Sequence, residues 1–136
     1  MEPTNILPIV VFLSLVTVEF GGWALLTFLS GREGLSPWQK GFFRAGHAHA
    51  GVLVILGLVV LILTSHPGVP AWANQGGTAV LWAAVLMPAG FFLSVIGKDP
   101  QRPSKLIVLL WVGAASLTVG LVCAGVGLVL AATAAT

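Results

Sequence analysis

Charged residues are scarce in this chain. Only 7% of the 136 residues are charged, six of them basic and four acidic, while 57% are hydrophobic. A soluble domain carries about 25% charged residues, because its surface must face water. Ten charges cannot cover a globule of this length, so a soluble globular class is excluded. The mean hydropathy of +1.04 agrees, and we expect one small domain whose solvent is the lipid bilayer.

Cysteine, a large net charge and catalytic motifs are lacking as well. The single cysteine, Cys123, lies in an apolar run and has no partner for an intrachain disulfide. A formal net charge of +2 is too small for a nucleic-acid-binding surface, so no nucleic-acid partner is expected. The sequence has no phosphate-binding loop, nucleophile elbow, C-x-x-C or H-E-x-x-H motif. It therefore favours a non-enzymatic role without excluding an enzyme.

Four long apolar runs dominate what is present. A helix needs about 20 apolar residues to cross the hydrocarbon core, and each run is of this order. The runs do not alternate as barrel strands would. Short segments containing proline and glycine separate them, so consecutive helices should be antiparallel neighbours. We predict an all-α, four-helix antiparallel bundle, integral to the membrane, as a single transmembrane domain over 1–136, with helices at about 6–29, 41–64, 78–96 and 106–132.

The basic residues predict the orientation of this bundle. All six lie in, or within one turn of, the first and third connections: Arg32, Lys40, Arg44, Lys98, Arg102 and Lys105. Short loops rich in Lys and Arg stay in the cytoplasm, so both termini should be extracytoplasmic. The first run lacks the basic start and the cleavage site of a signal peptide, and we expect it to remain as a helix. The expected location is a bacterial inner membrane.

Small residues form a stripe along the fourth run. Gly113, Gly120 and Gly127 recur every seven residues, and Ser116 and Ala124 fall on the same stripe. Small residues let helix backbones approach closely in lipid. The stripe predicts close packing, either within the bundle or between copies of the chain. We accordingly expect a homo-oligomer or a place in a larger membrane complex.

Polar residues interrupt the first two runs at similar depth. Glu19 lies about ten residues before the end of the first helix and His49 about nine residues into the second, so at about 1.5 Å per residue both should lie roughly 13–15 Å from one membrane boundary. His47 is shallower, and Arg44 shallower again. An antiparallel hairpin brings these residues together, and we predict a buried proton- or ion-binding cluster of Glu19, His49, His47 and Arg44.

The two histidines cannot play the same part. Residues two apart on a regular helix point about 200° apart, so His47 and His49 cannot ligate one centre unless the helix is distorted. If His49 turns towards Glu19, His47 must turn towards another helix, another subunit or the membrane interface.

The string Arg44-Ala-Gly-His47-Ala-His49 resembles the R-x-x-H and H-x-H patterns that open helices of haem–copper oxidase catalytic subunits. In that family such a histidine ligates haem, which implies a ligand role for His47 or His49. The chain departs from the family because no facing run offers a second histidine, and His66 lies in the second connection. The chain is also similar to small, uncharacterised four-helix bacterial membrane proteins with a helix-borne G-H-x-H.

Three functions remain open at this point. The first, which we favour, is proton or cation handling by the cluster around Glu19 and His49. The second is a redox component that binds haem b or copper through His47 and His49, with Met87 as a weak further ligand. The third is an accessory or assembly subunit of a larger membrane complex, in which the buried charges only fix helix positions.

Overall fold

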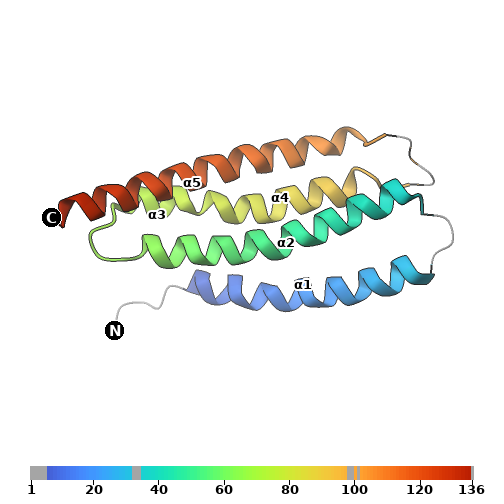
Figure 1. Cartoon of the computed structure of the whole chain (residues 1–136), viewed down its shortest axis with the longest axis horizontal. Helices are drawn as coiled ribbons and strands as arrows, with labels where there is room; N and C mark the ends of the chain where they lie inside the picture. Colours follow the sequence, from blue (N-terminus) through green and yellow to red (C-terminus); the bar gives the residue numbers. More distant parts are fainter. Residues whose placement is uncertain (1–5, 32–34, 98–99, 101, 136) are drawn as a thin grey trace.

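The computed structural model describes residues 6–31, 35–97, 100 and 102–135. Throughout these residues the regular structure is helical, and four helical spans are long and apolar enough to cross a membrane. This confirms the predicted all-α membrane class. Figure 1 shows the spans side by side, each running opposite to the one before it. The helices are α1 (Ile6–Gly31), α2 (Pro37–Thr64), α3 (Ala71–Gly77), α4 (Ala79–Leu93), the short 3-10 helix η1 (Lys105–Ile107) and α5 (Val108–Ala134).

The start of α2 is fixed by a capping box. The Ser36 hydroxyl accepts a hydrogen bond from the Gln39 N–H (3.2 Å), and the Gln39 side chain accepts one from the Ser36 N–H (3.1 Å). Pro37 follows at the first helical position, where its fixed φ suits a helix start. The helix therefore begins at Pro37, earlier than the predicted start at residue 41.

The third span also begins earlier than predicted, because α3 occupies part of the expected second connection. Its glycines are packing positions. A Cβ added at Gly76 would lie 2.6 Å from Cys123 Cβ, and one at Gly77 would lie 2.8 Å from Val60 Cγ1. The segment thus packs between α2 and α5. The predicted loop at 71–77 is wrong, because glycine serves here for close helix contact.

The small residues of α5 face α3 and α4. A Cβ at Gly113 would lie 2.9 Å from the Met87 backbone nitrogen, and one at Gly120 would lie 2.8 Å from that of Val80. At Gly127 an added Cβ would collide with α3. No side chain larger than hydrogen fits at these three places without moving a neighbouring backbone.

Two other members of the stripe lie in the same contact. The Ser116 hydroxyl crosses to α4 and donates to the Ala79 carbonyl at 2.8 Å. Ala124 is buried in a cluster with Val60 and Val80. The whole stripe therefore lies inside the single chain, so it is not left free for a contact between copies.

Two amide side chains tie further helices together. Gln39 is 1% exposed, and its Nε2 donates to the Val95 carbonyl (3.1 Å) and the Gly97 carbonyl (3.2 Å) just past the end of α4. At the other end of α2, Asn74 Nδ2 in α3 donates to Thr64 Oγ1 at 2.8 Å. These bonds and the glycine contacts join α2, α3, α4 and α5 into one closely packed body, which we name the α2–α5 unit.

The first helix stands apart from this unit. Within the described residues, α1 packs against α2 alone (Figure 1). The contact is made by a narrow stripe in which Val18 lies against Gly51, whose added Cβ would be 3.7 Å from Val18 Cγ1. The molecule is therefore an open bundle with one loosely held edge.

Basic residues gather at one end of the bundle, where α2 and α5 begin. The described members are Lys40, Arg44, Arg102 and Lys105. Arg32 and Lys98 lie outside the described residues. We name this the basic end.

Candidate functional site

Glu19 lies near the middle of α1 with its side chain exposed. The stripe of α1 that faces α2 passes through Val18 and Gly22. Glu19 follows Val18 directly and so points about 100° away from it. It lines a surface hollow with Phe20 and Trp23, which are each 67% exposed. The sequence predicted that Glu19 is buried between the first two helices. In the single chain its side chain is exposed instead.

His47 is the histidine that faces α1. A Cβ added at Gly22 would lie 3.0 Å from His47 Nε2, so the imidazole occupies space that Gly22 leaves open. The side chain is half-buried. It lines two neighbouring hollows, one of which it shares with Arg44. Arg44 and His47 are thus the predicted pair that the structure does bring together.

His49 faces the opposite direction, towards α4. Its Nδ1 lies 2.7 Å from the Ala45 carbonyl, which can only accept, so Nδ1–H is the donor. The ring packs on Phe91, with the centroids 4.8 Å apart. His49 and Glu19 therefore do not meet, and the alternative in which His49 turns towards Glu19 is not the one observed. His47 faces α1 and His49 faces α4, as expected for two residues that point about 200° apart on one helix.

The donor set for a haem or copper site is not assembled in the described part of the chain. No group of three or more His, Cys, Asp or Glu side chains there is placed to hold a metal ion. Met87 lies in the hydrophobic core with Leu53 and Ala83, close to α5. His47 and His49 lie on different sides of α2. A haem ligated by two of these residues within one chain does not fit this arrangement.

Two adjacent glycines of α1 were not singled out by the sequence analysis. Gly22 makes room for His47, whereas a Cβ added at Gly21 would meet nothing within 4 Å. Gly22 thus lies in the contact between α1 and α2, and Gly21 borders open space. The sequence feature that could have indicated them is two consecutive glycines, which are weak helix formers, in the middle of a long apolar helix.

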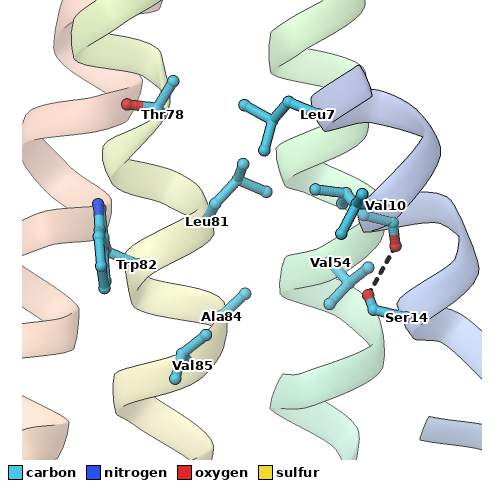
Figure 2. Close-up of a pocket in the computed structure, with 10 residues that line it drawn as sticks. Leu7, Val10, Ser14, Val54, Thr78, Leu81, Trp82, Ala84 and Val85 are labelled. Carbon is cyan, nitrogen blue, oxygen red and sulfur yellow. Dashed lines mark hydrogen bonds between the residues drawn. The ribbon is translucent and has the colours of Figure 1, made fainter. Parts of the chain in front are cut away.

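An apolar groove separates α1 from α4, with α2 as its floor (Figure 2). Its volume is about 460 Å³. The residues that line it are Leu7, Val10, Val11 and Ser14 of α1, Val54 of α2, and Thr78, Leu81, Trp82, Ala84 and Val85 at and after the start of α4. We name it the α1–α4 groove.

A second hollow, of about 240 Å³, continues along the same three helices towards the basic end. It is lined by Thr17, Val18, Gly21, Leu25, His47, Ala50 and Phe92. His47 and Leu25 also border the third hollow, which contains Arg44. The second and third hollows therefore adjoin at His47 and Leu25, whereas the α1–α4 groove lies further along α1 and shares no lining residue with either.

No known family model, curated protein or solved structure matches the chain. Function is therefore inferred from three features of the chain itself: the exposed Glu19, the pair of Arg44 and His47, and the α1–α4 groove.

Proposed function

We propose that the chain is a subunit of a membrane assembly and that α1 docks it there. The observation that carries this proposal is the exposed carboxyl of Glu19 near the middle of a 26-residue apolar helix. An ionisable group at the centre of the bilayer costs about 3 kcal/mol or more, so such groups face protein or water. A surface holding Glu19 therefore requires a partner, which we expect to be a second copy or another membrane protein.

The surroundings of Glu19 support a protein contact. We name the Glu19 face as Glu19 with its exposed neighbours on α1: Phe12, Val16, Phe20 and Trp23. Large aromatic side chains around one polar group are typical of the centre of an interface. The exposed surfaces of α4 and α5 also carry a large aromatic side chain each, Trp82 and Trp111, but neither helix contains an acidic residue. The partner should offer a hydrogen-bond donor or a basic side chain at the depth of Glu19.

Glu19→Leu tests this proposal. One interhelical hydrogen bond in a membrane contributes about 1–2 kcal/mol, so association should weaken about five- to thirtyfold. Association would be measured by energy transfer between labelled copies in vesicles, and by native mass spectrometry of complexes extracted in mild detergent. The matched control is Thr118→Leu, because Thr118 is an exposed polar residue of α5 whose hydroxyl donates within its own helix. Equal association of the wild type and Glu19→Leu would overturn the proposal.

Proton or cation handling is a second candidate, favoured by a specific arrangement. Arg44 and His47 line one hollow, and His47 touches α1 at Gly22, one turn after Glu19. With a partner over the Glu19 face, an acid and an imidazole would lie on neighbouring sides of α1 inside the membrane. Vesicles holding the wild type should dissipate a pH gradient, and Glu19→Gln should abolish this. A wild type that leaks no faster than empty vesicles would reject the idea.

We also propose the orientation and location. The basic end should face the cytoplasm, because Lys and Arg in short loops are retained there. Both chain ends would then be extracytoplasmic, in a bacterial inner membrane. Labelling of single introduced cysteines from outside intact cells tests this: residues 66–69, between α2 and α3, should react, and residue 102 should not.

A further inference from the structure

The α1–α4 groove is open to the bilayer along its whole length, because α1 touches α2 alone among the described helices. From Leu25 in the second hollow to Ser14 in the groove the α1 side runs about 16 Å, given a rise of about 1.5 Å per residue. One leaflet contributes about half of the roughly 30 Å hydrocarbon core. The groove and the second hollow together are therefore long enough to hold an acyl chain of one leaflet.

The polar groups along this groove are almost all satisfied by their own helices. Ser14 donates to the Val11 carbonyl (2.6 Å, dashed in Figure 2), and Thr17 donates to the Ser14 carbonyl (2.6 Å). Thr78 donates to the Gln75 carbonyl at 2.6 Å. These hydroxyls already have hydrogen-bond partners, so the groove and the second hollow suit a hydrocarbon chain.

His47 differs from these hydroxyls. It makes no hydrogen bond to any described residue. Because no buried side-chain nitrogen or oxygen of the described residues lacks a partner, the ring nitrogens of His47 are not buried. Its ring nitrogens are therefore reached from the hollows that it lines. Arg44 borders the third hollow, with its side chain exposed. An imidazole and a guanidinium beside the mostly apolar second hollow complement an anionic head with a hydrocarbon tail.

We propose that the chain binds an anionic phospholipid here, with the phosphate at Arg44 and His47 and one acyl chain in the second hollow, its end reaching the near end of the α1–α4 groove. The charge of the site and the apolar lining match the two parts of such a lipid. The basic end gathers further positive charge around the mouth, which attracts anionic lipids within a Debye length. This inference does not rest on the Glu19 face, since residues 19 and 21 point about 200° apart on α1.

A pair of glycine variants tests the position of the acyl chain. Gly21→Leu fills the second hollow, where an added side chain meets nothing within 4 Å; Gly125→Leu on α5 is the matched control, because Gly125 is equally open and lies outside the groove. Each displaced methylene costs about fourfold in affinity, so phosphatidylglycerol should bind Gly21→Leu more than about tenfold more weakly. Binding would be measured by native mass spectrometry of delipidated protein titrated with this lipid. Equal affinities of the two variants would overturn the proposal.

A pair of arginine variants tests the head group. The wild type should prefer phosphatidylglycerol to phosphatidylcholine, and Arg44→Gln should reduce this preference about fivefold. Arg102→Gln, at the same end of the molecule but lining none of the three hollows, should reduce it by less than about twofold. No preference in the wild type, or equal preferences in the two variants, would overturn the assignment of the phosphate to Arg44.

A third measurement needs no variant and so does not depend on how variants fold. Phosphatidylglycerol with a photoreactive group at the end of one acyl chain would be cross-linked to the native protein in vesicles. The label should concentrate on the groove lining in α1 and α4, as mapped by peptide mass spectrometry. Label spread evenly over the exposed faces of all helices would contradict the proposal.

Discussion

The first helix and the α2–α5 unit use the same kinds of residue in opposite ways. In the unit, Gln39, Asn74 and Ser116 send hydrogen bonds across helix boundaries. In α1, the hydroxyls of Ser14 and Thr17 donate to carbonyls of their own helix. The glycines differ likewise, because Gly113, Gly120 and Gly127 of α5 are closed by neighbouring helices while Gly21 of α1 borders open space. Both regions are apolar enough to cross a membrane, so hydropathy does not distinguish them.

This difference separates stability from function in the molecule. The unit satisfies the amides and the hydroxyl at its helix contacts internally, and within it Arg44 and His47 of α2 stay open to a ligand. The first helix leaves a carboxyl exposed on one side and borders a groove on the other. We expect changes at the helix contacts inside the unit to alter folding, and changes on α1 or at Arg44 and His47 to alter binding. The predictions below test the stability half of that division.

The largest loss of stability should follow from Gly120→Leu. The new side chain would displace the Val80 backbone, 2.8 Å from the position of its Cβ, and separate α5 from α4. Overpacking of a closed contact costs about 1–3 kcal/mol and more where backbone must move, so we expect about 3 kcal/mol. The measurement is reversible unfolding in mixed micelles with increasing dodecyl sulfate. Gly125→Leu should unfold like the wild type; a similar loss in both would show that the α5 contact is not the cause.

A smaller loss should follow from Gln39→Leu. This change leaves the Val95 and Gly97 carbonyls and the Ser36 N–H without their side-chain partner. Unsatisfied buried polar groups cost about 1–3 kcal/mol, so we expect about 2 kcal/mol in the same assay. Gln75→Leu is the control, because Gln75 is exposed in α3. Wild-type stability for Gln39→Leu would mean that the contact between the start of α2 and the end of α4 holds without this amide.

The smallest effect on global stability should come from Gly22→Val, which crowds His47 at the α1–α2 contact. A Cβ there lies 3.0 Å from His47 Nε2, and the histidine can move into the neighbouring hollows. We expect less than about 1 kcal/mol in unfolding but faster amide exchange in α1, because loosely held elements open locally. Hydrogen exchange with mass spectrometry would resolve the helices. Faster exchange in α4 or α5 as well would show that α1 supports the unit more than its contacts indicate.

The sequence predicted the membrane class and the approximate spans because long apolar runs permit few other structures. It also predicted that His47 and His49 diverge, since the angle between them follows from helix geometry. Glu19 shows where such reasoning stops. Depth follows from counting residues, but the face does not. Glu19 is adjacent to Val18, and the angle of about 100° between them separates a position that faces α2 from an exposed one.

The segment 71–77 shows a second limit. Glycine and proline at its borders are typical of a turn in water. In lipid the same glycines permit close helix contact, and Ala73 is fully buried. Whether this segment forms a loop or a packed helix depends on its contact with α5, which is distant along the chain. A local sequence pattern cannot contain that information.

The attachment of α1 to α2 alone has a consequence for how the protein is made. Because synthesis proceeds from the amino terminus, α1 enters the bilayer before the helices of the unit exist. Its one intrachain partner is the very next helix to emerge, so the α1–α2 hairpin can form early. Glu19 then stays accessible while α3, α4 and α5 are still being added. If α1 docks the chain as we propose, capture of α1 can begin during biogenesis, so assembly need not wait for synthesis of the later helices.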